Sequence, residues 1–185
     1  MCGILGQFSF TERTNIEELL DEINTLRHRG PDDGAWWQDG PFFLAHRRLS
    51  IIDLSSGRQP MASRDGRLVI TFNGEIYNYI ELREELRSLG RRFQTESDTE
   101  VLLQAYDEWG HDMPAKLKGM FAFGIADRLK RQLFLARDRF GEKPLLYVDH
   151  QWGVTFASEM RPLTALTSVS RAIDEDALAA FMCLN

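Results

Sequence analysis

Cys2 directly follows the initiator methionine, and this position gives the residue a specific chemical option. If Met1 is removed, the thiol and a free α-amine lie on neighbouring carbons, whereas a retained methionine would acylate that amine. The pKa of a model thiol is about 8.5 and that of an α-amine about 7.7 to 8.0, so the amine can accept the thiol proton and later give it to a leaving amine. Cys2 is therefore a candidate nucleophile with its own base. A small buried apolar residue and a lipid-modified anchor are the alternatives from position alone.

The pair Asn73-Gly74 is a candidate partner for such a nucleophile. Attack on an amide creates an oxyanion, and each preorganised donor to it is worth about 3 to 4 kcal/mol. An Asn-Gly pair after an apolar run first suggests a hairpin turn. The residues that follow have helical character, however, so we expect the pair at a strand-to-helix corner. There the glycine N–H and the asparagine side-chain amide are both donors to an oxyanion.

The elements that must position these residues are predicted from hydrophobic periodicity and turn residues. A strand over 2–10 places Cys2 at its end. An amphipathic helix follows Asn15 and keeps its period to Leu26, and further helices begin at Asn78 and Ser97. Their inward faces are expected to carry Tyr79, Leu82, Leu86 and Leu89 in the second helix and Val101, Leu102, Ala105, Tyr106 and Trp109 in the third. Extended segments are predicted at 34–40, 41–53 and 66–74, hairpins at 120–138 and 144–158, and a last helix within 173–185.

This order of elements favours an α+β fold. Many antiparallel strands are grouped apart from the helices, and the long apolar strands need cover on both faces. We therefore predict a four-layer αββα sandwich, in which two antiparallel sheets are flanked by helices.

Composition narrows the classes of function. The chain has 185 residues, 43% of them hydrophobic, and a net charge of -6, which argues against a nucleic-acid surface and favours small neutral or zwitterionic ligands. Two cysteines form no disulfide framework, and neither they nor the four histidines have the spacing of metal ligands, so no metal site or cofactor is expected. Without a leader or membrane segment in the sequence, we expect a cytoplasmic protein with no membrane partner.

A set of motifs in a fixed order carries a resemblance to a known family. These motifs are CGI at 2–4, RHRGPDD at 27–33, HRRLSIIDL at 46–54, QPM at 59–61, FNGEIYNY at 72–79, SDTE at 97–100, ARDRFGEKPL at 136–145 and ASE at 157–159. Together they resemble the glutaminase domain of asparagine synthetases, which are class II glutamine amidotransferases of the N-terminal-nucleophile (Ntn) hydrolase superfamily. The resemblance covers nearly the whole chain.

The resemblance implies a role for each matching residue. Cys2 would form a γ-glutamyl thioester, Asn73 and Gly74 would provide the oxyanion hole, Arg48 would bind the α-carboxylate of glutamine and Asp98 its α-ammonium. The rest of the pocket would be lined by Leu49, Ser50, Ile51, Ile52 and Glu75. An arginine and an aspartate suit an amino-acid ligand. From the residues alone, Arg48 also fits a solvated strand face, and Asp98 fits a helix N-terminus, where an acid is favoured in any case.

The implied reaction is hydrolysis of L-glutamine to L-glutamate and ammonia. The domain would span 2–165, and 166–185 would lead toward an ATP-dependent synthetase domain that makes asparagine; ATP and Mg would bind only there. The expected partners are L-glutamine, that synthetase domain and, as one option, a second copy of the chain. The alternatives are a synthetase domain that aminates another carboxylate, and a non-catalytic glutamine-binding module.

Two further expectations concern residues without an assigned catalytic role. The loop at 137–143 is expected to be held by salt bridges among its charged side chains and to shape a boundary with a following domain. Cys183 is expected to be an inert, partly buried residue.

Overall fold

The computed structural model describes residues 1–11, 14–49 and 58–184. Its strands are β1 (Gly3–Ser9), β2 (Asp33–Asp39), β3 (Phe42–Arg48), β4 (Met61–Ala62), β5 (Leu68–Ile76), β6 (Gly119–Asp127), β7 (Gln132–Arg137), β8 (Leu146–His150) and β9 (Gly153–Ala157). Its helices are α1 (Ile16–Asn24), α2 (Tyr79–Ser88), α3 (Asp98–Trp109), the 3₁₀ helix η1 (Gly110–Lys116), α4 (Met160–Ala165) and α5 (Glu175–Leu184). The predicted helices and strands in the described residues are present.

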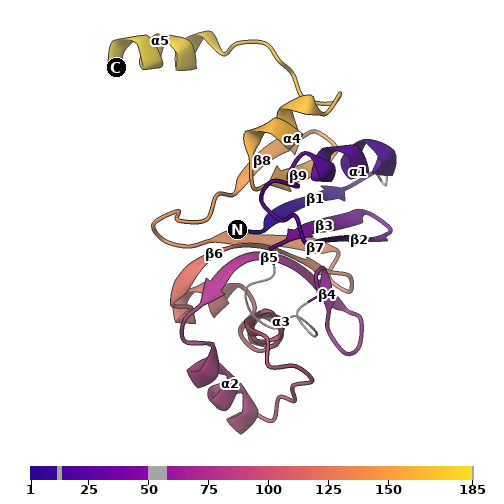
Figure 1. Ribbon diagram of the computed structural model, residues 1–185, viewed down its shortest axis with the longest axis vertical. Coiled ribbons are helices and arrows are strands. Elements are labelled where there is room, and N and C mark those ends of the chain that lie inside the picture. The colour runs from indigo at the N-terminus through magenta and orange to yellow at the C-terminus, as the bar shows by residue number, and fades with distance from the viewer. Residues whose placement is uncertain (12–13, 50–57, 185) are drawn as a thin grey trace.

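The strands form two antiparallel sheets. One has the order β2-β3-β1-β9-β8 and the other the order β4-β5-β6-β7. Figure 1 shows α1 and α4 on the outer face of the first sheet, and α2 and α3 on the outer face of the second. The predicted four-layer αββα sandwich is confirmed.

Three apolar layers separate the four layers of the sandwich. Between the sheets lie Ile4, Leu44 and Phe156, which are fully buried. The first sheet packs on α1 and α4 through a cluster that includes Leu5, Leu19, Ile23, Leu26 and Leu163. The second packs on α2 and α3 through a cluster that includes Phe72, Leu82, Leu86, Val101, Leu102 and Tyr106. Strands with side chains buried on both faces explain the long apolar runs of the sequence.

The helix faces agree with the periodicity except at one position. Leu89 was expected to face inward but is 51% exposed, because α2 ends at Ser88 and Gly90 follows with a positive φ of 89°. Leu26 is buried as expected, although it lies in the turn after α1 and not in the helix.

The last helix lies apart from the sandwich. In Figure 1, α5 projects from the body on an extended segment, and its described side chains are exposed. The prediction that Cys183 is partly buried is therefore wrong, since this residue is exposed on α5. Within the described part of the chain, no helix is long and apolar enough to cross a membrane.

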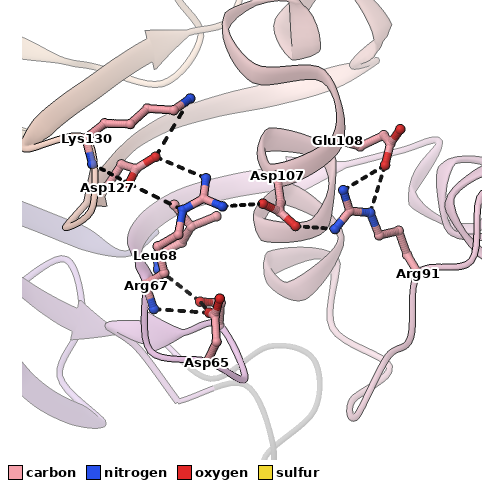
Figure 2. A network of polar contacts seen from close by, with 9 residues as sticks. Asp65, Arg67, Leu68, Arg91, Asp107, Glu108, Asp127 and Lys130 are labelled. Carbon is pink, nitrogen blue, oxygen red and sulfur yellow. Dashed lines mark hydrogen bonds and ion pairs between the residues drawn. The ribbon is translucent and has the colours of Figure 1, made fainter.

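A network of ion pairs fastens α3 to the second sheet (Figure 2). Arg67, just before β5, donates to Asp107 of α3 at 2.8 Å and to Asp127 at the end of β6 at 3.1 Å. Arg91 joins the other side of the helix, where it contacts Asp107 and donates to Glu108 at 2.8 Å. The helix that begins at Asp98 is thereby tied to the sheet near its C-terminal end.

The Arg67→Met variant is expected to lower the free energy of unfolding at neutral pH by about 2 kcal/mol, because it leaves the buried Asp127 carboxylate without its main partner. Burial alone would raise the pKa of Asp127, but hydrogen bonds from Arg67 and the Lys130 amide hold it below its usual value. This stabilisation is present above the ordinary carboxyl pKa and is lost as the pH falls through the lower folded-state pKa.

Urea unfolding of the wild type and of Arg67→Met over a range of pH measures the difference in their free energies of unfolding. This difference should shrink as the solution becomes strongly acid. Arg87→Met is the control, since the exposed Arg87–Glu84 pair should contribute less than about 0.5 kcal/mol. A loss of stability no larger in Arg67→Met than in Arg87→Met would contradict the role assigned to the network.

Candidate active site

A pocket of about 360 Å³ lies at the end of the sandwich where β1 and β6 begin and β3 and β5 end. Its wall also includes residues from the start of α2 and from the segment that leads into α3. A volume of this size is in the range of small-molecule sites. The pocket therefore collects side chains from both sheets and from the helices that cover the second sheet.

Cys2 directly precedes the first residue of β1, at the strand end as predicted, and lines this pocket. Its Sγ is 3.9 Å from the backbone oxygen of Leu49, which also lines the pocket. Arg29 donates from Nε to the carbonyl oxygen of Cys2 at 3.0 Å and from Nη1 to Glu159 at 2.9 Å. The position of Cys2 is thus fixed by a partly buried ion pair that joins two distant segments of the chain.

Arg29 was not selected from the sequence as a site residue. The RHRGPDD motif contains it, but the motif gave no indication that the guanidinium would reach the Cys2 carbonyl. Burial would raise the pKa of Glu159, yet hydrogen bonds from Arg29 and His28 hold it below its usual value. The carboxylate is therefore charged at neutral pH and keeps Arg29 in place.

The prediction that Asn73-Gly74 lies at a strand-to-helix corner is wrong. Both residues lie inside β5, where Asn73 pairs with Ala122 and Gly74 with Phe121 of β6. The strand continues past them because β6 extends to Gly119 and supplies partners as far as Ile76. A Cβ at position 74 would lie 2.2 Å from the Met120 carbonyl oxygen, so the close approach of the two strands requires glycine there.

The side chain of Asn73 is nevertheless placed as an oxyanion donor would be. Only 2% of the residue is exposed, it lines the pocket, and its Nδ2 is buried with no hydrogen-bond partner among the described residues. An unpaired buried amide costs about 1 to 3 kcal/mol in stability. Such a donor is expected where a ligand atom supplies the missing acceptor.

The backbone just before Asn73 is held on both sides. The Phe72 amide donates to Gln59 Oε1 at 2.6 Å, and the Phe72 carbonyl accepts from His46 Nε2 at 3.1 Å. Burial, with a contribution from the nearby Arg48, lowers the pKa of His46 to about 4, so the ring is neutral at pH 7. Gln59 and His46 therefore fix the strand that presents Asn73 to the pocket.

The predicted binding residues Arg48, Glu75 and Asp98 line the same pocket. Arg48 ends β3 and is 8% exposed, so it does not lie on a solvated strand face. Asp98 opens α3 and accepts a hydrogen bond from the Ile76 amide at 3.2 Å. Burial raises the pKa of Asp98, and the neighbouring Glu75 adds to this effect. The pocket thus contains the buried Arg48 cation together with the carboxylates of Glu75 and Asp98.

The loop at 137–143 is built differently from the prediction. In place of salt bridges, the Asp138 carboxylate accepts backbone amides from Phe121, Phe140, Glu142 and Lys143, and Arg137 donates to the Lys143 carbonyl oxygen at 2.8 Å. This turn buries the Lys143 side chain, whose Nζ lies 3.5 Å from Met1 Sδ. Lys143 lines the pocket and was missed as a site residue.

Of the predicted site residues, Cys2, Arg48, Leu49, Asn73, Gly74, Glu75 and Asp98 meet in this pocket. Ser50, Ile51 and Ile52 lie outside the described residues. Among the described residues, no cluster of three histidine, cysteine or acidic side chains could hold a metal ion. The arrangement brings together a thiol, a buried amide donor without a partner among the described residues, and charged side chains of both signs.

Comparisons with known proteins agree with this chemistry. A family model described as a glutamine amidotransferase domain matches residues 1–185. Asparagine synthetase (glutamine-hydrolyzing) 1 of Bacillus subtilis (strain 168) is 44% identical over 186 residues, which is 98% of this chain and 29% of the relative. A putative asparagine synthetase (glutamine-hydrolyzing) of Mycobacterium tuberculosis (strain ATCC 25618 / H37Rv) is 41% identical over 205 residues, which is 100% of this chain and 31% of the relative.

Solved structures show the same architecture. The glutamine phosphoribosylpyrophosphate amidotransferase of B. subtilis, complexed with ADP and GMP, superposes with a TM-score of 0.71 over 89% of this chain and 43% of that chain, at 22% identity. This likeness supports the four-layer sandwich fold. The chain spans less than a third of the length of the curated relatives named above.

Proposed function

Since the chain belongs to the glutamine amidotransferase domain family, we propose that it hydrolyses L-glutamine to L-glutamate and ammonia in the pocket that contains Cys2. One observation carries the proposal: the buried Asn73 amide nitrogen has no partner among the described residues and lies in the wall of the same pocket as the Cys2 thiol. Acyl transfer requires a nucleophile and a preorganised hydrogen-bond donor for the oxyanion.

The reaction needs Met1 to be removed, so that the α-amine of Cys2 is free. The amine takes the thiol proton, and the thiolate attacks the side-chain amide carbon of glutamine. Asn73 Nδ2 and the Gly74 N–H donate to the oxyanion that forms. The proton then passes to the leaving nitrogen, ammonia departs, and a γ-glutamyl thioester remains. Water attacks this thioester, which releases glutamate and restores the thiol.

The charged groups of the pocket would orient the substrate. Arg48 binds the α-carboxylate through its planar guanidinium, and Asp98 binds the α-ammonium. Leu49 and Glu75 contribute to the lining. A non-catalytic module that binds glutamine would also satisfy the Asn73 donor, but it would have no need of a thiol in the same pocket, so hydrolysis is the better account.

The Asp98→Asn variant is expected to raise the KM for glutamine by about 10- to 100-fold with little change in kcat, because a charged hydrogen bond to the ammonium contributes about 1.5 to 3 kcal/mol. In the wild type, KM should rise as the pH falls through the raised pKa of Asp98, since the neutral acid no longer pairs with the ammonium. Steady-state glutaminase assays over a pH series measure both effects. The acid-side rise in KM must be absent from Asp98→Asn; an identical pH dependence in both proteins would contradict the assignment.

The asparagine synthetases to which the chain is similar are more than three times its length. We propose that the ammonia passes to an ATP-dependent synthetase domain, where ATP and Mg bind, and that the product of the whole protein is asparagine. Residues 2–165 would form the glutaminase domain, and 166–185 would begin the connection to that domain. A cytoplasmic setting fits this reaction. Ammonia delivery to another carboxylate would use the same glutamine pocket. Assays of the full-length protein with aspartate and with other carboxylate acceptors distinguish the two alternatives.

Release of glutamate by the chain that begins at Cys2 tests the proposal. The processed chain should form glutamate from glutamine, whereas the chain that retains Met1 should not, because its residue 2 has no free amine. Calorimetry that finds glutamine binding by the processed chain, without any glutamate release, would support the non-catalytic alternative instead.

A further inference from the structure

We propose that Arg83 of α2 is a positioning residue for the glutamine pocket: it fixes the segment 96–98 and so places Asp98 opposite the substrate ammonium. The inference rests on the proposed function. Arg83 was not selected from the sequence, and it does not itself line the pocket. Its effect on the substrate passes through three residues that do, Tyr79, Glu96 and Ser97.

The polar contacts of Arg83 and its contact with the Tyr79 ring lie at the pocket wall, and its guanidinium also lies over the Phe93 ring of the core, 5.3 Å from the ring centre. The residue is only 3% exposed although it carries a charge. Its Nη1 pairs with the Glu96 carboxylate, and its Nη2 donates to the Ser97 carbonyl oxygen at 3.2 Å. Its guanidinium carbon lies 5.7 Å from the centre of the Tyr79 ring. One planar group therefore fixes a side chain of α2 relative to the segment that enters α3.

The same segment is anchored from its other side by α3 itself. Glu100 accepts the backbone amides of Gln94 at 2.8 Å and Thr95 at 2.7 Å, and Ser97 Oγ caps the helix by accepting the Thr99 amide at 3.1 Å. These bonds fix the segment within its own helix. Arg83 is the described side chain that links residues 96 and 97 to α2, which lies beside α3 on the outer face of the second sheet in Figure 1.

Stability alone does not account for this arrangement. The Nε of Arg83 is buried and has no partner among the described residues, and an unpaired donor on a buried cation lowers stability. Glu96, which receives the ion pair, has an 83% exposed side chain, so the pair itself contributes little. The contacts instead bring the start of α2, residue 96 and residue 97 to one place.

Geometry, more than charge, connects Arg83 to Asp98. The main influences on the pKa of Asp98 are burial, hydrogen bonds from the backbone amides of Ile76, Thr99 and Asp98 itself, and the nearby Glu75. The polar contacts of Arg83 are instead with Glu96 and Ser97, so loss of Arg83 is expected to act on Asp98 by displacing its carboxylate. A small displacement of a positioning group is enough to weaken binding by an order of magnitude or more.

The test is steady-state glutaminase kinetics of the processed chain. Arg83→Met should raise the KM for glutamine about tenfold or more while kcat stays within about twofold of the wild type. Arg83→Lys, which keeps the charge but not the planar pair of donors, should give an intermediate rise. Arg83→Ala should raise KM as Arg83→Met does but leaves space for a small guanidinium compound, so methylguanidine in the assay should lower its KM toward the wild-type value, a recovery that a purely structural defect would not show.

The control is Arg87→Met on the same helix. Arg87 also lies over the Phe93 ring and forms an exposed ion pair with Glu84, but it contacts neither Glu96 nor Ser97 in any hydrogen bond of the described residues. Its KM should be unchanged. In the double variant Arg83→Met/Asp98→Asn, KM should match that of Asp98→Asn within about twofold, because one defect acts through the other.

The possible results distinguish a failure of the positioning role of Arg83 from a failure of the proposed glutaminase function. An unchanged KM in Arg83→Met, or KM increases that multiply in the double variant, would overturn the positioning role while the glutaminase activity stands. If Arg83→Met fails to fold, as judged by circular dichroism, an unchanged KM in folded Arg83→Lys overturns it equally. A processed wild type without glutamate release would overturn the proposed function, and this inference with it.

Discussion

The Cys2→Ala variant is expected to release glutamate from glutamine at least about 10⁴-fold more slowly than the wild-type chain, because alanine offers no nucleophile and no route to the thioester. The pocket itself should survive, since the carbonyl oxygen that accepts from Arg29 belongs to the backbone and remains at residue 2. Glutamine should therefore still bind. Glutamate release and calorimetry with glutamine, on the same processed sample, measure the two effects.

Cys183→Ala is the matched control, because the only other cysteine of the chain lies exposed on α5. Its activity should equal that of the wild type. Glutaminase activity that persists in Cys2→Ala would remove Cys2 from the mechanism, and a loss of activity in Cys183→Ala would contradict the assignment of Cys183 as an inert residue.

The Asn73→Ala variant should lower kcat about 10²- to 10³-fold with little change in KM, which is the usual cost of removing one oxyanion donor. Its stability should change by less than about 1 kcal/mol, because Nδ2 has no partner to lose among the described residues. Activity and stability are thus expected to separate. Glutaminase kinetics and urea unfolding of the same preparation measure both quantities.

Asn78→Ala is the control, and we expect it to affect stability but not activity. Asn78 donates from Nδ2 to the Lys116 carbonyl oxygen at 3.0 Å, and its Oδ1 accepts the Lys118 amide at 2.9 Å. This variant should lose about 1 kcal/mol of stability and keep its activity. If Asn73→Ala instead behaved like Asn78→Ala, the Asn73 side chain would be a structural group and the oxyanion assignment would be wrong.

The layers of the fold could be predicted because the local patterns are consistent with one another. Apolar positions at helical spacing mark α1, α2 and α3, and the strands carry apolar runs between turn residues. These patterns could not predict how many residues of each strand pair with the neighbouring strand. The extent of β5 depends on where β6 begins, and that is a property of two segments far apart in the sequence. The error at Asn73-Gly74 follows from this.

The candidate site could be predicted only where a residue type has a role of its own. Cys2, Arg48 and Asp98 belong to motifs, and their chemistry can be read from the side chain. Arg29 and Arg83 act through the backbone atoms and side chains they hold, at Cys2 and Ser97 respectively. A sequence indicates that an arginine is present but not which carbonyl oxygen its guanidinium will reach, because that depends on packing between elements. Supporting residues are therefore seen only in the folded chain.

The loop at 137–143 shows a similar limit. Alternating charges suggested ion pairs, but Asp138 satisfies backbone amides instead, which is a common use of an aspartate in a turn. The consequence is a buried Lys143 at the pocket wall. Composition could indicate a charged loop, and only the backbone conformation decides which charge is turned inward.

The central claim is that a free Cys2 attacks the side chain of glutamine, and covalent capture tests it most directly. The processed chain is incubated with a diazoketone analogue of glutamine, whose reactive carbon forms a bond to a thiolate with loss of dinitrogen, and is then digested for peptide mass spectrometry. We predict one adduct per chain, on Cys2, that is prevented by excess L-glutamine and absent when Met1 is retained. A chain shown to begin at Cys2 that remains unlabelled, or that is labelled only on Cys183, would contradict the account.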